Sequence, residues 1–125
     1  MDIELSTFSA VQQQALFDLL ILAIYADKKV SSADDQDLQQ LLIAMGHTNE
    51  MDRQREFDAA VARILPSTKS VQTAKKLALG LAEAFTDRQQ HKQVYAMVQA
   101  KLSSDHHVTA WESTLLSELR LKFRV

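Results

Sequence analysis

Apolar residues recur along most of the chain at the three- and four-residue spacing of amphipathic helices, and no segment alternates long enough to predict a strand. The stretch 15–26 differs, because only Asp18 interrupts its apolar residues. A helix that is apolar on nearly every side must be enclosed by other helices. It is also too short to cross a bilayer, which takes about 20 apolar residues. We therefore expect this stretch to be the buried axis of an all-α helical bundle.

Six helices are predicted, each bounded by residues that cap or end helices. The first begins near Ser6 or Ser9 and runs to about Ala26, and the second stops at Gly46. The third begins at Thr48 or Asn49. The predicted helices cover approximately residues 9–26, 31–45, 49–65, 70–85, 87–102 and 109–123.

The apolar stripes also predict which side chains of these helices face the core. Gly80 interrupts the most regular stripe, that of the fourth helix, and we expect it to let a neighbouring helix approach closely. The predicted inward residues of the second to sixth helices are Leu38, Leu41, Leu42 and Met45; Phe57, Ala60, Val61, Ile64 and Leu65; Val71, Ala74, Leu77, Ala78, Leu81, Ala82 and Phe85; His91, Val94, Tyr95, Met97, Val98 and Leu102; and Leu115, Leu116, Leu119 and Phe123.

Composition narrows the class of protein. The 125 residues predict one domain, residues 1–125, and 46% apolar content supplies its core. The chain has no cysteine, which excludes disulfides, thiolate catalysis and cysteine-ligated zinc. A net charge of −2 with interspersed signs argues against nucleic-acid binding. The acidic start of the chain lacks the basic region of a signal peptide, so a cytoplasmic location is expected.

Two polar turns repeat one pattern. In each, an aspartate precedes two polar residues, an aliphatic residue, a hydroxyl residue and, three positions later, an acid. The hydroxyl residue and the later acid have the spacing of a capping box. The matching residues lie at one offset of 78, as from 27 to 105: Asp27, Val30, Ser31, Asp34, Leu38, Leu41 and Met45 against Asp105, Val108, Thr109, Glu112, Leu116, Leu119 and Phe123. We infer an internal repeat of two helical hairpins, with the third and fourth helices between them.

The first turn, Ala26-Asp27-Lys28-Lys29-Val30-Ser31-Ser32-Ala33-Asp34, resembles the motif of the TerB-like family of tellurite-resistance proteins, and residues 105–112 resemble it less closely. That motif reads alanine, aspartate, glycine, any residue, an aliphatic, serine or threonine, two residues and an acid, and it often occurs twice. Lys28 and His106 stand where the family has glycine. The resemblance implies an all-α fold, a cytoplasmic stress-response role, partners that include membrane-bound proteins of the same resistance system, and acids that bind a metal.

The acids of the two turns carry the candidate chemistry. If the hairpins pair, Asp27, Asp34, Asp105 and Glu112 converge on one surface, where four oxygen donors suit Mg²⁺, Ca²⁺ or Mn²⁺. A local interpretation explains the same spacing, since the acids also accept amide hydrogen bonds, close capping boxes and complement helix dipoles. Both interpretations stay open. An EF-hand is excluded, because the loop that starts at Asp27 lacks the required glycine and the final glutamate.

The aromatic and cationic candidates are fewer. Trp111 lies in the first turn of the last predicted helix, where an indole either anchors a partner protein or covers the edge of the core. His91 shares a face with Val94 and Val98, which predicts a packed, hydrogen-bonded histidine rather than a metal ligand.

The chain carries no nucleophile elbow, phosphate-binding loop or dinucleotide fingerprint. We therefore expect a non-enzymatic TerB-like protein of tellurite or general stress resistance. It would bind a partner protein, a divalent cation, or both through its two acidic turns. One alternative is a plain helical interaction module in which the acids only cap helices, and another is a metal-dependent hydrolase that uses the same carboxylates.

Overall fold

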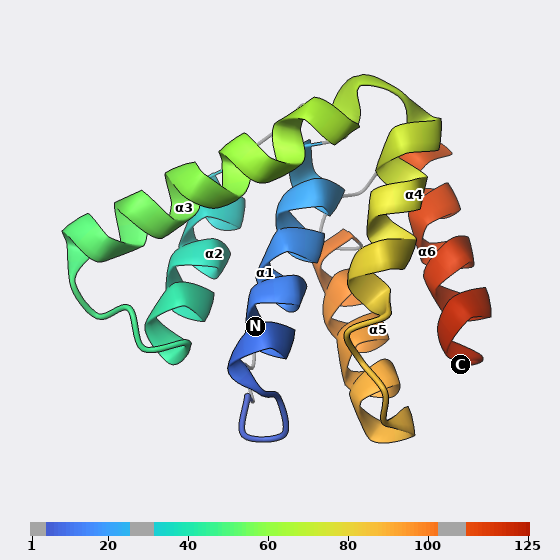
Figure 1. Cartoon of the computed structure of the whole chain (residues 1–125), viewed down its shortest axis with the longest axis horizontal. Coiled ribbons are helices and arrows are strands. Elements are labelled where there is room, and N and C mark those ends of the chain that lie inside the picture. The colour runs from blue at the N-terminus through green and yellow to red at the C-terminus, as the bar shows by residue number, and fades with distance from the viewer. Residues whose placement is uncertain (1–4, 26–31, 103–109) are drawn as a thin grey trace.

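The computed structural model describes residues 5–25, 32–102 and 110–125, which form a compact bundle of helices (Figure 1). A 3₁₀-helix, η1 (Leu65–Lys69), joins the third helix to the fourth. No strand occurs in these three ranges, so the prediction of an all-α fold is confirmed. The six α-helices are α1 (Ala10–Tyr25), α2 (Ser32–Ala44), α3 (Glu50–Ile64), α4 (Val71–Ala82), α5 (Arg88–Leu102) and α6 (Ala110–Phe123).

The axis of the bundle is α1, which contacts α2, α3, α4, α5 and η1 (Figure 1). Its ten consecutive residues from Ala15 to Ile24 are all buried. A helix apolar on every side gains most when each side is removed from water, which confirms the predicted enclosure of this stretch. None of the helices in the described ranges has the length and apolarity needed to cross a membrane.

The one acid inside α1 is compensated by two partners. Asp18 is 7% exposed, and its Oδ1 accepts hydrogen bonds from Arg63 Nη2 at 2.9 Å and Gln14 Nε2 at 3.0 Å. A carboxylate this deeply buried requires such partners. The ion pair also attaches the end of α3 to the middle of α1.

Local capping chemistry fixes the helix ends. Ser9, rather than Ser6, caps α1: its hydroxyl accepts from Gln12 N at 3.2 Å, and Gln12 Oε1 accepts from Ser9 N at 2.9 Å. This reciprocal pair is a capping box. Asn49 caps α3, and Ser70 caps α4. At the end of α2, Gly46 has a φ of +106°, in the left-handed region, as predicted for the terminating glycine.

Two predicted inward positions, Leu65 and Val71, are wrong, and so is the close helix approach expected at Gly80. Leu65 and Val71 are 48% and 55% exposed. Leu65 is the first residue of η1 and Val71 the first of α4, so both lie at the corner where the chain turns from α3 into α4, and a corner has fewer neighbours to cover it (Figure 1). At Gly80 a Cβ atom would meet nothing within 4 Å, so no part of the described chain makes a close approach there.

The cap at the start of α1 and the bonds at the end of α2 have counterparts in α5 and α6, 78 residues later along the chain. The same offset separates Gln12 from Gln90. The N-cap Ser9 corresponds to Asp87, whose Oδ1 accepts from Gln89 N at 2.8 Å. Arg124, the counterpart of Gly46, also has a positive φ, 58°. The bond that closes α2, His47 N to Leu42 O at 2.9 Å, corresponds to Val125 N to Arg120 O at 3.2 Å.

Candidate functional site

The candidate site is the end of the bundle at which α1 and α5 finish and α2 and α6 begin. Figure 1 shows α1 and α5 running in the same direction, with α2 and α6 returning on either side of them. Gln12 and Gln90 join the starts of α1 and α5, since each side-chain amide donates to the carbonyl oxygen of the other, at 3.1 and 3.0 Å. This reciprocal pair holds the two parallel helices in matching register.

The four predicted acids are only partly within the described residues. Asp27 and Asp105 lie outside them, and Asp34 is in the first turn of α2 with its side chain outside the described atoms. Glu112 is in the first turn of α6 and is 3% exposed. The convergence of the four carboxylates therefore stays a prediction.

A buried lysine is the strongest electrostatic feature of this end. The Lys101 side chain, in the last turn of α5, is 5% exposed, and its Nζ donates to Asp37 Oδ2 in α2 at 2.8 Å. A buried ammonium requires an anionic partner, and Asp37 supplies one from the other hairpin. Asp37 of α2 thus has a cation provided by the chain itself.

Trp111 packs into the edge of the core in this structure. It is 8% exposed and joins the same buried cluster as Leu115 and Leu119. Within the described residues its indole Nε1 has no hydrogen-bond partner, which is an uncommon state for a buried indole. In this arrangement the side chain covers the core and leaves little surface for a partner.

No three His, Asp or Glu side chains gather into a potential metal site in the described part of the chain. His91 is packed as predicted: its ring stacks on Phe123 with centroids 4.6 Å apart, and its Nε2 lies 2.6 Å from Phe85 O. This finding on metal sites does not cover Asp27, Asp105, His106 and His107, because they lie outside the described residues.

The sequence analysis did not identify Asp37 and Lys101 as a pair. From the sequence, Asp34, Asp35 and Asp37 suggest a solvated first helical turn. In the structure, however, Asp37 binds Lys101 of the other hairpin. The signal was present in α5, because Lys101 follows Val94 and Val98 at the spacing of that helix's buried face. A lysine at a core position indicates a buried partner.

Comparison of the chain with family models, with curated proteins and with solved structures gives no match. The likeness to the TerB-like family therefore rests on the residues of the two turns.

Proposed function

We propose that this chain is a non-enzymatic TerB-like helical domain that acts in tellurite or general stress resistance. It binds a partner protein through the end of the bundle that carries the two acidic turns, and a divalent cation at the same end completes the binding surface. The supporting observation is the parallel course of α1 and α5. The caps at their starts, and the ends of α2 and α6, match at one offset of 78 residues. Related hairpins that run parallel direct their turns to one end of the molecule.

The cation is tested by titration with Mg²⁺, Ca²⁺, Mn²⁺ and Zn²⁺. Trp111 is the chain's one tryptophan, so its fluorescence reports on this end directly. A cation bound only by the native state at 100 times its dissociation constant adds about 2.7 kcal/mol to the free energy of unfolding. We expect stabilisation of the wild type by at least one of the oxygen-preferring ions, and none of the variant with Asp27→Asn and Asp105→Asn.

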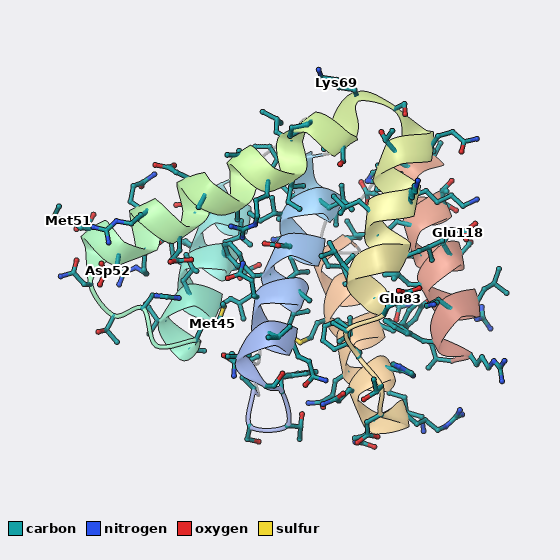
Figure 2. The ribbon with its side chains drawn as sticks, viewed as in Figure 1. Met45, Met51, Asp52, Lys69, Glu83 and Glu118 are labelled. Atoms are coloured by element: carbon teal, nitrogen blue, oxygen red, sulfur yellow. The ribbon has the colours of Figure 1, made fainter. Side chains whose placement is uncertain are left out.

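A matched control removes two negative charges elsewhere. Asp52 and Glu83 have exposed side chains in the first turn of α3 and just after α4 (Figure 2). The variant with Asp52→Asn and Glu83→Gln should keep the cation response of the wild type. A wild type that no cation stabilises would remove the cation from the proposal.

The interaction module without a cation is the second candidate, and the Lys101–Asp37 pair favours it. The Lys101 ammonium already compensates the carboxylate of Asp37 in α2, as a bound metal would. This candidate predicts that Asp27→Asn with Asp105→Asn lowers the free energy of unfolding in the absence of metal, since charge-assisted hydrogen bonds from the turn amides become weaker neutral ones.

A further inference from the structure

Gly80 lies where two surface hollows meet on α4. One hollow, of about 350 Å³, lies between α1 and α4 and is lined by residues that include Val11, Ala15, Gly80 and Leu81. The other, of about 390 Å³, extends from Gly80 past Leu77 and Lys76 to Thr73 and to Ser67 of η1. The two hollows share Gly80, and we call them together the α4 groove, which is mainly apolar and open to solvent.

The groove has the length and direction of a short helix. Thr73, Leu77 and Gly80 follow one another at three- and four-residue steps along α4, with Lys76 beside Leu77, and Ala84 lies just beyond the end of the helix. From Thr73 to Ala82 the helix rises roughly 14 Å at 1.5 Å per residue, or about two and a half turns. Small-ligand sites enclose most of their ligand, whereas an open apolar groove along a helix suits a second helix.

Gly80 has no role inside the chain that explains it. A glycine within a helix costs about 1 kcal/mol relative to alanine, and a Cβ atom here would touch nothing. A glycine on an exposed helix face lets the backbone of another helix approach closely. A helix that packs on this face from outside the described chain would explain why position 80 is glycine.

The charges of the groove select the chemistry of its occupant. Asp18 borders the hollow between α1 and α4, but Arg63 neutralises it at 2.9 Å. Lys76 is exposed at the other end, and no ion pair with a described residue involves it. The uncompensated charge is thus positive and attracts an acidic side chain.

We propose that the α4 groove binds an amphipathic helix of a partner protein, with a small residue against Gly80 and an acidic side chain against Lys76. The exposed side chain of Val11, 74% accessible at the rim, joins the apolar contact. This surface runs along α1 and α4 from Ser67 of η1, at the end of the bundle where α1 finishes, to Val11 and Ala84 at the opposite end. None of the residues that line it belongs to the two acidic turns, so it is a second docking site.

The test uses a designed helical peptide of about 18 residues, long enough for partial helicity in solution. Leucines flank a central alanine on its apolar face, and one version carries glutamate where the other carries lysine, at the end that faces Lys76. The full chain has only two glycines, so the Gly80 backbone amide can be followed by NMR with the Gly46 amide as an internal reference. We expect the glutamate peptide to shift the Gly80 signal and leave Gly46 unchanged.

Variants then locate the contact. Gly80→Leu should weaken peptide binding by at least about tenfold, because the new side chain fills the groove. Val11→Ser replaces an exposed side chain, leaves folding intact and should weaken binding severalfold. Lys76→Glu should weaken the glutamate peptide and strengthen the lysine peptide, whereas Lys92→Glu, the same charge change on exposed α5 surface, should do neither.

Three results would overturn the proposal. The first is a Gly80 amide that neither peptide shifts, and the second is equal binding by wild type and by both Gly80→Leu and Val11→Ser. The third is a Gly80 shift that depends on protein concentration alone, which would make a second copy of the chain the occupant.

Discussion

The two glycines show how a single residue's backbone angle decides the effect of a substitution. A Cβ atom meets no other atom at either position, but Gly46 has a φ of +106° and Gly80 is helical. Gly80→Ala should raise the free energy of unfolding by about 0.5–1 kcal/mol, because alanine favours the helix. Gly46→Ala should lower it by about 1 kcal/mol or more, because L-residues resist that φ.

Urea unfolding of the two variants measures both effects. Since neither position has a steric neighbour, packing contributes nothing to the comparison. Equal effects of the two substitutions would contradict the backbone explanation.

The structure shifts the titration of Tyr25. Burial raises the pKa of its hydroxyl above the ordinary 10.0, and the nearby carboxylates of Asp35 and Asp58 raise it further. A group whose pKa is raised in the folded state contributes full stability below its unfolded pKa and loses it as the pH rises through the folded value. The wild type should therefore lose stability above about pH 10, and Tyr25→Phe should lose less.

Tyrosinate absorbance, followed against pH in a Tyr95→Phe background, isolates this hydroxyl, because Tyr25 and Tyr95 are the only tyrosines. In the same background, Asp35→Asn should move the midpoint down toward the ordinary value. A midpoint that Asp35→Asn leaves unchanged would exclude the charge contribution.

At the scale of helices, sequence reasoning worked where the cause is local. Stripes of apolar residues identified the cores of α3 to α6, and Ser9, Asn49, Ser70 and Gly46 marked helix ends, because capping depends on residues within one turn. It failed at Leu65, whose exposure depends on the direction in which the chain turns after α3. No local pattern records that direction.

The contact between α1 and α3 provides a test at this scale. Arg63→Met keeps most of the apolar stem of the side chain but removes the cation that compensates Asp18. We expect the free energy of unfolding to fall by about 2–3 kcal/mol, less than for a fully buried pair, because the Arg63 side chain is 46% exposed. The measurement is chemical unfolding of the single variant.

The double-mutant cycle isolates the ion pair. In an Asp18→Asn background the carboxylate charge is absent, so Arg63→Met should cost less than about 1 kcal/mol. Equal costs in the two backgrounds would mean that Arg63 acts through packing of its stem rather than through its charge.

At the scale of the molecule, the relation between two hairpins stays a prediction from residue types, and nothing in that pattern predicts the bond between α5 and α2. The repeated caps and turns are visible as residue types at a constant offset, whereas the Lys101–Asp37 pair has no counterpart in the other copy. The equivalents of these two residues are Ala23 and Leu115, which are both buried and apolar. A contact that occurs in one copy only cannot be found from the symmetry of the pattern.

The last prediction concerns the Lys101–Asp37 pair, because it connects α5 of one hairpin to α2 of the other. Lys101→Met should lower the free energy of unfolding by about 3 kcal/mol, since it leaves a carboxylate without its buried cation. Lys92→Met, an exposed lysine on the same helix, should change it by less than about 0.5 kcal/mol. Adding Asp37→Asn to Lys101→Met should recover at least about 1 kcal/mol, which measures the charge separately from the lysine's other contacts.

Two probes show whether the loss belongs to the whole molecule. Trp111 fluorescence reports on α6, while far-ultraviolet circular dichroism averages over all helices. Because α1 packs against α5 in one core, both probes should give the same lowered midpoint for Lys101→Met. Separate midpoints would show instead that the hairpins unfold independently, and that the lysine stabilises only the end of the bundle around α2 and α5.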